Sequence, residues 1–585
     1  MKKRSQAQVS RQLLNVLLCL PFLLILSGTA TAQPEAQAVV GKYIAAWRGF
    51  YPSAAFAYGD TAAAGNFEVY TDPATDQWLA FNEATAAEVR ALLEPAQVDL
   101  STRIDLQVLL GQVEDELANW REDQPLTQQP QWYAEQISQA LTHLLVRDQL
   151  SEEDRSIALI ARLQGVQRLC HKAVQSLAGG NALRTQTALR TLEGTREFYS
   201  GNLRTLTAAW PAGSKVTSIE AAIDLAVESI QDFEVHLRES IMPGASASAA
   251  INAKYYASKL ARRTSGLYTP TTLLEAAADE MRDVRMLMNS EAQRWQATEQ
   301  KRVKEVYAND DSVLAAAIEA METDRQDNSA DFLASFTTLT FAAQRFVEEH
   351  HLASIPKPTT LIIALSPSHF SGAAVGGVYP TGPFAPESDT LFYVPSIADT
   401  AAPDVQEGFY RSFNTHFNTM IMSHEMFPGH YLQYKVAVSE APAVRSLFAN
   451  GSYVEGWGTF SEELMLDAGW ADNAPLTRLA HLRKRLENAT RAYVSVQVNT
   501  ADWNESQVLT FAKEEGLLAP QFAKNLWQRV VNSPMQITDY FTGYHHFKRL
   551  FAIYQTSPQN DGPQRWVDAV LRAGPVPPVM LEKLL

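Results

Sequence analysis

The sequence predicts a mainly α-helical protein with one small β-sheet, built as a single large fold of two lobes. Two observations carry this prediction. From about residue 36 to residue 350, apolar residues recur at three- and four-residue spacing in segments rich in Ala, Leu, Gln, Glu and Arg, as in amphipathic helices. Near Pro356 short β-branched and aromatic runs replace this pattern, and after Ser396 helical spacing returns and continues to the C-terminus.

The first 32 residues have the layout of a secretory signal peptide. A basic start precedes an apolar run from Leu13 to Leu26, and the segment ends in small residues with Ala30 and Ala32. We expect cleavage after Ala32 and export to the periplasm or the extracellular space, with an uncleaved N-terminal anchor as the alternative. No later apolar run is long enough to cross a bilayer, so we expect no stable membrane span after cleavage.

Helices are expected throughout residues 33–350, with breaks at clusters of Gly and Pro such as Gly179-Gly180 and Pro243-Gly244. The clearest helical periodicity covers residues 98–120, 157–177, 219–237 and 273–303.

Two short strands are expected next, at Thr359–Leu365 and Thr390–Val394. The residues between them, 366–388, are rich in Gly and Pro and predict a loop. We expect the resulting small sheet to lie beside a helix that begins near Arg411.

Composition excludes one class of function. Acidic residues outnumber basic ones, 65 to 49, giving a net charge of -16, and cleavage of the first 32 residues would make it -20. Nucleic-acid binding is disfavoured because a phosphate backbone needs clustered Lys and Arg. Only Cys170 would remain among the cysteines, so no intrachain disulfide is possible.

The segment that carries chemistry begins at His424-Glu425 and reaches its second histidine at His430. Neutral imidazoles suit Zn²⁺, and a Glu beside the first ligand can act as general base on the metal's water. The alternative is a helix end with surface histidines.

The spacing of the two histidines needs a distorted backbone. On a straight helix, residues six apart point about 120° apart and lie about 9 Å apart along the axis. Pro428 lacks an N–H and crowds the carbonyl of His424, and Gly429 permits unusual backbone shapes. We therefore expect a bulge or kink that brings His430 back toward His424.

A catalytic zinc site normally has a third protein ligand, and Glu455 is the candidate. It follows His430 by 25 residues, enough for a turn and a returning helix. Glu462 shares its helix face and could bond a ligand histidine, whereas Glu463 is expected on a solvated face.

Tyr540 and Tyr544 lie on a predicted C-terminal helix, where a tyrosine hydroxyl can donate to the oxyanion of a tetrahedral intermediate. The alternative is that both belong to the core. Arg491 could bind a substrate carboxylate or pair with Glu487, four residues earlier, which we favour.

These motifs resemble the bacterial domain-of-unknown-function family 885 (DUF885). The resemblance rests on His424-Glu425-x-x-Pro428-Gly429-His430-x-x-Gln433, Glu455-Gly456-Trp457, Glu462, Tyr540-x-x-Gly543 and Gly377-x-Tyr379. The resemblance implies a mostly helical metallopeptidase-like fold, zinc as the bound metal and a poorly defined substrate. The first motif is also similar to that of dipeptidyl peptidase III, which has an inserted residue between its histidines.

One stretch departs from the family pattern. The family commonly carries an Asp-Thr-Gly stretch with a nearby His after the helix of Arg491, where this chain has Val498-Asn499-Thr500-Ala501-Asp502-Trp503. A substrate role for these positions is therefore in doubt.

The leading hypothesis is an exported mononuclear zinc peptidase with one Zn²⁺ per chain, held by His424, His430 and Glu455, and with Glu425 as general base. Residues 33–350 would form a helical N-terminal lobe and residues 351–585 the metal-site lobe, without a clear linker. A zinc amidase acting on a non-peptide or cell-wall-derived substrate and a non-catalytic binding protein are the alternatives. A di-iron centre needs two Glu-x-x-His motifs, and only Glu348-x-x-His351 is present.

Overall fold

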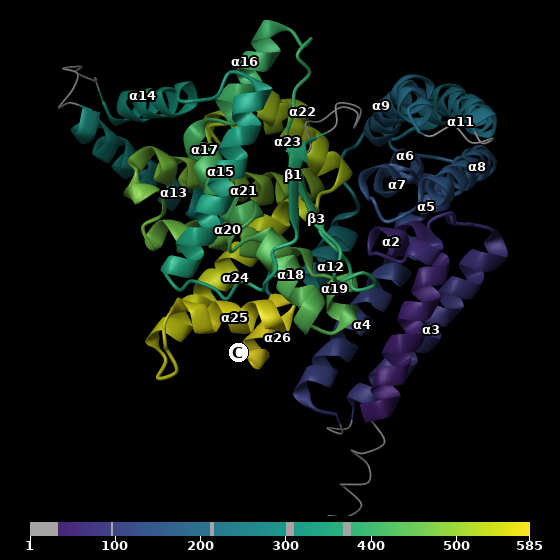
Figure 1. Ribbon diagram of the computed structural model, residues 1–585, viewed down its shortest axis with the longest axis horizontal. Helices are drawn as coiled ribbons and strands as arrows, with labels where there is room; N and C mark the ends of the chain where they lie inside the picture. The colour runs from purple at the N-terminus through teal and green to yellow at the C-terminus, as the bar shows by residue number, and fades with distance from the viewer. Residues whose placement is uncertain (1–32, 95–97, 211–215, 300–308, 367–375) are drawn as a thin grey trace, which may run out of the picture.

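The computed structural model (Figure 1) describes residues 33–94, 98–210, 216–299, 309–366 and 376–585. The predicted signal peptide, residues 1–32, lies outside the described residues. Within the described ranges, no helix is both long enough and apolar enough to cross a membrane.

Helices account for most of the chain up to residue 263. They are a helix over residues 33–50, α2 (Pro52–Ala57), α3 (Asp72–Leu93), α4 (Leu100–Ala118), α5 (Pro125–Gln128), α6 (Pro130–Gln139), α7 (Thr142–Val146), α8 (Glu152–Ser176), α9 (Ala182–Phe198), α10 (Arg204–Ala208), α11 (Val216–His236) and α12 (Ala253–Arg263). Short π-helical turns are η2 (Asn119–Asp123), η3 (Tyr199–Leu203) and η4 (Leu237–Ile241), and 3₁₀ turns are η1 (Thr61–Ala63), η5 (Met242–Gly244) and η6 (Trp470–Asn473).

The remaining helices, together with three strands, complete the fold. They are α13 (Pro270–Glu299), α14 (Asp310–Thr323), α15 (Ser329–Glu349), α16 (Pro403–Ser412), α17 (Thr415–Glu425), α18 (His430–Glu440), α19 (Ala443–Leu447), α20 (Gly451–Asp467), α21 (Pro475–Ala501), α22 (Glu505–Glu514), α23 (Pro520–Asn532), α24 (Gln536–Thr556), α25 (Pro563–Ala573) and α26 (Pro578–Leu584). The predicted mainly helical architecture is confirmed.

Helix ends follow local capping rather than the apolar pattern. The apolar pattern predicts a helix from residue 157, but α8 begins at Glu152 because the Ser151 side chain accepts a hydrogen bond from the backbone N–H of Asp154. The first turn of α8 is acidic and polar, so apolar periodicity cannot detect it. Likewise α17 begins at Thr415, capped by Asn414, whereas Arg411 lies in the preceding helix α16.

Among the described residues the sheet has three strands, one more than expected. β1 (Leu361–Leu365) pairs parallel with the central strand β3 (Thr390–Val394), and β2 (Gly377–Tyr379) pairs antiparallel with the other edge of β3. The prediction of a loop at β2 is wrong. Three residues that begin with glycine are too few to show the alternation of a strand, and the segment is extended because β3 offers it a free edge.

The sheet and the site helices are linked through α15. Phe336 on α15 packs against Phe392 of β3, with ring centres 6.1 Å apart, and α15 also packs on α17. On another side, Lys435 of α18 donates to Thr360, just before β1, at 3.1 Å. The sheet therefore braces the two helices that carry the His424–His430 segment.

Helices from both sides of residue 350 share one hydrophobic core. In Figure 1, α2 to α11 gather on the right and α13 to α26 on the left. The long helices α13 and α21 lie against each other, and α14 packs on α21, so helices before residue 350 pack within the C-terminal part. The division into two lobes at residue 350 stays a prediction.

Candidate metal centre

The polypeptide between His424 and His430 breaks into two helices. α17 ends at Glu425 and α18 begins at His430, so the expected bulge or kink is corrected to a complete break between two helices. Pro428 cannot donate a helical hydrogen bond. Gly429 passes so close to the end of α17 that a Cβ there would lie 1.9 Å from the carbonyl oxygen of His424. Only glycine fits this approach.

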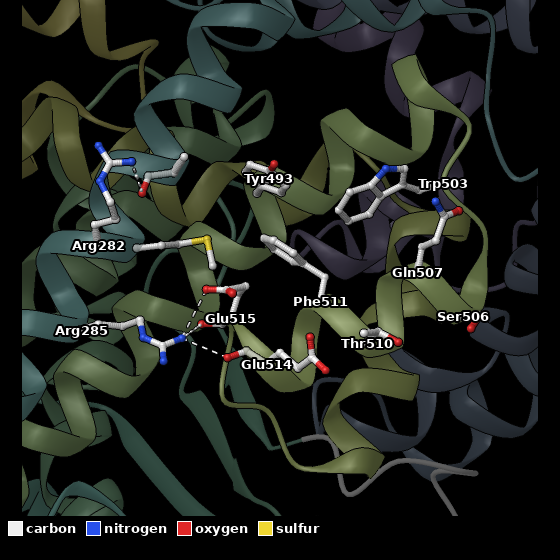
Figure 2. Close-up of a pocket in the computed structure, with 12 residues that line it drawn as sticks. Arg282, Arg285, Tyr493, Trp503, Ser506, Gln507, Thr510, Phe511, Glu514 and Glu515 are labelled. Carbon is white, nitrogen blue, oxygen red and sulfur yellow. Dashed lines mark hydrogen bonds and ion pairs between the residues drawn. The ribbon is translucent and has the colours of Figure 1, made fainter. Parts of the chain in front are cut away.

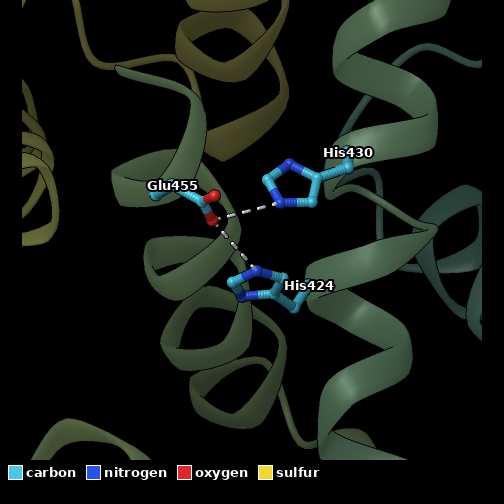
Figure 3. A group of neighbouring side chains, drawn as sticks. All are labelled: His424, His430 and Glu455. Carbon is cyan, nitrogen blue, oxygen red and sulfur yellow. Dashed lines mark ion pairs between the residues drawn. The ribbon is translucent and has the colours of Figure 1, made fainter. Parts of the chain in front are cut away.

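The break brings both imidazoles to Glu455 on α20, as Figure 3 shows. The Nε2 atoms of His424 and His430 lie 3.9 Å and 3.6 Å from Glu455 Oε2. One ligand atom from each of the three side chains lies within 4.8 Å of the other two. His424 is 4% exposed and His430 is 8% exposed, so the cluster is largely shielded from solvent.

These distances suit a shared metal ion better than direct hydrogen bonds. Both exceed the 2.7–3.2 Å of ordinary N–H···O bonds, so the histidines and the glutamate converge without bonding tightly to each other. Three ligand atoms around one tetrahedral zinc lie about 3.3 Å apart, because each stands about 2.0–2.2 Å from the ion. Small side-chain movements would close the difference. Two imidazoles and one carboxylate also form a ligand set that zinc commonly takes in catalytic sites.

Without an ion, the charges of this cluster interact strongly. Burial acts to raise the pKa of Glu455, but contact with His430 and the charges of His430 and His424 outweigh it and lower the pKa to about 2. For His430 burial acts to lower the pKa, but Glu455 and Glu425 raise it to about 9. Because metal ligands must be deprotonated, an ion would have to displace this proton.

The second nitrogen of each histidine ring is held by a fixed partner. His424 Nδ1 lies 2.8 Å from Glu462 Oε1, as expected from the sequence, and His430 Nδ1 lies 3.2 Å from Gln433 Oε1. Such contacts fix the tautomer and leave Nε2 free for a metal. Glu462 is fully buried, and its other oxygen lies 2.7 Å from Nδ1 of His481 on α21. Sequence reasoning missed His481, because no neighbouring residue marks it.

The glycines of the sequence motifs allow the site helices to touch. A Cβ on Gly456 of α20 would lie 2.4 Å from the Cα of Gly543 on α24, and a Cβ on Gly543 would lie 1.7 Å from the carbonyl oxygen of Ser452. A Cβ on Gly458 would lie 2.6 Å from the ring of His424. Trp457 between them donates to the carbonyl of Pro428 at 2.9 Å, which ties α20 to the break.

Tyr540 lies beside the cluster. Gln536 Nε2 lies 3.4 Å from both Glu455 Oε1 and the Tyr540 hydroxyl. Burial and the charge of Glu455 raise the pKa of Tyr540 to about 12, against the opposing effect of Arg491 and Arg529. The hydroxyl is therefore protonated at neutral pH and available as a hydrogen-bond donor.

A second tyrosine near the cluster was missed by sequence reasoning. Tyr434 stands one turn after His430 on α18, with ring centres 6.0 Å apart. Burial and the nearby charges of Glu455 and Glu425 raise its pKa. The four-residue spacing from His430 was the available signal, because residues at i and i+4 share a helix face.

Tyr544 lies in a different environment. Its hydroxyl donates to Glu463, eight residues along α20 from Glu455, and accepts from Lys548 at 3.1 Å. Glu463 also pairs with Lys548 at 2.9 Å and lies 3.8 Å from Arg485. The expectation that Glu463 faces solvent is wrong, because α24 and α21 cover it. The structure thus places Tyr540 near Glu455 of the histidine cluster, whereas the hydroxyl of Tyr544 is bound to Glu463.

Glu425 and Arg491 lie around the same centre. The half-buried Glu425 ends α17 directly after His424, and its charge acts on both His430 and Tyr434. Arg491 donates to Glu487, as favoured from the sequence, but its guanidinium also lies 5.1 Å from the ring centre of Tyr540.

A separate cavity of about 580 Å³ lies between α13 and α22 (Figure 2). Stacked rings of Tyr493 and Phe511 form part of its wall, and Arg285 pairs with Glu515 at its rim. Trp503, the last residue of the stretch that departs from the family pattern, also lines it. The departing stretch therefore reaches the α13–α22 cavity through Trp503.

The profile of one protein family, described as "Bacterial protein of unknown function (DUF885)", matches residues 52–585. The chain belongs to this family. A comparison with curated protein sequences gives no significant match.

Two solved structures share the fold of this DUF885 protein. A proposed lipoprotein of unknown function from Shewanella oneidensis matches with a TM-score of 0.77 and 18% identity, over 94% of this chain and 99% of that chain. A proposed lipoprotein from Colwellia psychrerythraea matches with a TM-score of 0.75 and 16% identity, over 94% of this chain and 98% of that chain. At these identities the likeness establishes the fold alone.

Proposed function

We propose that this DUF885 protein is a zinc-dependent hydrolase that cleaves peptide bonds. The convergence of His424, His430 and Glu455 on one buried point carries the proposal. It is supported by the contacts of Glu462 and Gln433, which orient the two rings. A structural pair of histidines would need neither the break at Pro428 nor the three-way approach to Glu455.

The residues around this point divide the chemistry between them. A zinc ion held by His424, His430 and Glu455 would supply Lewis-acid activation of water and of the scissile carbonyl. Glu425, adjacent to His424 but outside the ligand set, accepts the proton of the attacking water and passes it to the leaving amine. Tyr540 donates its hydroxyl hydrogen to the oxygen of the tetrahedral intermediate, since its raised pKa keeps it protonated.

Export is part of the proposal. The N-terminal segment predicts a cleaved signal peptide, and the two similar structures are described as proposed lipoproteins. We place the mature protein in the periplasm, or outside the cell.

Two other functions use the same residues. A zinc amidase acting on a non-peptide or cell-wall-derived substrate would need the same ligands and base, so only a cleavage profile separates it from a peptidase. A non-catalytic binding protein would have no need of Glu425. A di-iron centre at Glu348-x-x-His351 would use different residues. It loses support because Glu348 pairs with Lys357 at 2.6 Å on the surface.

The test of the proposal replaces Glu425 with Gln. The substitution preserves side-chain size but removes the base, so the variant is expected to fold, to retain about one zinc per chain and to lose activity about 100- to 10,000-fold. Metal content and the cleavage of a peptide library and of a set of non-peptide amides are measured on one preparation, beside the wild type. Full activity in a zinc-loaded Glu425→Gln protein excludes this mechanism, and cleavage of non-peptide amides alone supports the amidase.

A further inference from the structure

Three cationic side chains surround the ring of Tyr540. Lys484 and Arg491 come from α21, and Arg529 comes from α23. The Nζ of Lys484 lies 6.0 Å from the ring centre, and the Cζ atoms of Arg491 and Arg529 lie 5.1 Å and 5.8 Å from it. We call these three residues the cation cluster.

The positive charge of the cation cluster is only partly balanced. Glu487 accepts from Arg491 and lies 3.3 Å from the Nζ of Lys484, so one carboxylate serves both. Arg529 donates to the neutral side chain of Gln536 at 2.6 Å. Among the described residues, Glu487 is therefore the single carboxylate in contact with the cation cluster, while the more distant Glu462 also acts on Lys484. Three cations gather here although the net charge of the chain is -16.

Partial burial makes this excess energetically important. The side chains of Lys484 and Arg491 are 16% and 9% exposed, respectively. Burial, together with the charges of Arg491 and Arg529, lowers the pKa of Lys484, and the charges of Glu487 and Glu462 oppose the shift only in part. Neighbouring Asn488, 2% exposed, accepts from Arg491 at 3.1 Å, while its own amide nitrogen is a buried donor without a partner in the described structure. The region therefore offers more donors and more positive charge than its own acceptors satisfy.

The cation cluster lies next to the metal centre, on the other side of Tyr540. Tyr540 is the shared element, since its ring faces the cations and Gln536 links its hydroxyl to Glu455. Gln536 also contacts Arg529, so a single residue touches both sites. A substrate bound across Tyr540 would meet the cations on one side and the metal ligands on the other.

We propose that Lys484, Arg491 and Arg529 bind a carboxylate of the substrate while its scissile bond lies at the His424–His430–Glu455 centre. This rests on the proposed function and narrows its substrate class to peptides that carry a carboxylate close to the cleaved bond. Guanidinium groups suit this task because their planar donors match the two oxygens of a carboxylate. The carboxylate is either the free C-terminus or an acidic side chain.

Binding to the inactive, zinc-loaded Glu425→Gln protein tests the inference without turnover. The probes are three random tripeptide libraries: one with free carboxyl ends and without Asp or Glu, the same library amidated, and an amidated library with Glu at one position. Retention of each library is measured under identical salt. We expect the free acids, the Glu-containing amides, or both, to bind at least about tenfold tighter than the neutral amides, as for a charged hydrogen bond.

Substitutions then locate the preference. Arg529→Gln and Lys484→Met are each introduced into the Glu425→Gln protein. Each is expected to reduce the preference for carboxylate-bearing peptides at least about tenfold, while the binding of neutral amides stays unchanged. Arg549→Gln is the matched control. Arg549 lies on α24, the helix that carries Tyr540, but it pairs with Glu582 at 2.7 Å on the surface. It should leave the preference intact.

The outcomes separate the two proposals. Equal retention of all three libraries, or retention of none, overturns the carboxylate site. A preference for carboxylate-bearing peptides that survives in both Arg529→Gln and Lys484→Met also overturns it. A carboxylate preference that depends on the cation cluster, in a protein whose wild type cleaves no library, overturns the hydrolase proposal and retains the carboxylate site. Preference for free acids over Glu-containing amides identifies the C-terminus as the recognised group, and the reverse identifies an acidic side chain.

Discussion

Two clusters of histidine and glutamate lie two turns apart on α20, and their distances differ. At Glu455, the nearest histidine nitrogens stand 3.6 Å and 3.9 Å away, outside hydrogen-bonding distance. At Glu462, histidine nitrogens stand 2.8 Å and 2.7 Å away, so both carboxylate oxygens are bonded. His424 belongs to both clusters, with one ring nitrogen directed to each.

The difference separates a binding site from its support. Around Glu462 both carboxylate oxygens are bonded to histidine nitrogens, and these bonds hold the side chains in place and stabilise the fold. Side chains that converge without bonding, as around Glu455, leave space and lone pairs for one. Neighbouring Glu463 extends the bonded region through Tyr544 and Lys548.

The largest effect is expected from a substitution that disrupts both clusters together. Both clusters depend on the contact between α20 and α24. Gly543→Ala places a Cβ 1.7 Å from the backbone carbonyl of Ser452, which cannot move without separating the helices. We expect a loss of more than about 3 kcal/mol in the free energy of unfolding, measured by urea denaturation. Gly408→Ala on α16, where no atom lies within 4 Å of the new Cβ, is the control and should stabilise by about 0.5–1 kcal/mol. Similar stability of the two variants would show that the close contact is not required.

The next effect separates the two tyrosines. Tyr540→Phe should keep zinc and fold but lower kcat about 100- to 1,000-fold, as the loss of an oxyanion donor does. Tyr544→Phe removes a bond to Glu463 instead, so we expect little change in kcat and a loss of about 1–3 kcal/mol in stability. The measurements are steady-state kinetics and urea denaturation of both variants. A larger kinetic effect from Tyr544→Phe would contradict the assignment of the two clusters.

The sequence predicted the residues of the centre better than the backbone that presents them. His424, Glu425, His430 and Glu455 were recognisable because their chemistry is local and their spacing is characteristic. The complete break between α17 and α18 was not, since a Pro-Gly pair permits a kink as readily as a break.

Partners distant in the chain were also hidden. Tertiary packing of α21 brings His481 to Glu462 and Lys484 to the ring of Tyr540, and no local pattern marks either residue. Tertiary packing also explains the wrong prediction for Glu463. Its position on the helix predicted a solvent-exposed side chain, but α24 and α21 cover it. In the sheet, β1 and β3 were predicted by composition, whereas the three-residue β2 depends on its pairing with β3.

The smallest expected effect is a pH-dependent change in stability at Glu463, beside the bonded Glu462 cluster. Burial acts to raise the pKa of Glu463, but the charges of His481, Lys548 and Arg485 lower it to about 2, below its ordinary value of 4.5. A depressed carboxyl stabilises the fold above its unfolded pKa and loses that contribution as pH falls toward its folded pKa. Glu463→Gln should therefore be less stable than the wild type by about 1–3 kcal/mol at pH 7. The gap should narrow as pH falls below about 4.5, and a gap independent of pH in urea denaturation from pH 7 to pH 3.5 would rule out this role.

The two clusters are distinguished most directly by the metal content of two histidine variants. His430→Ala removes a proposed ligand, whereas His481→Ala removes a partner of Glu462 and leaves all three ligands in place. Each protein is loaded with zinc, dialysed against metal-free buffer and analysed by inductively coupled plasma mass spectrometry. Our account predicts about one zinc per chain in the wild type and in His481→Ala, and none in His430→Ala. Stoichiometric zinc in His430→Ala would contradict the assignment of the metal centre to His424, His430 and Glu455.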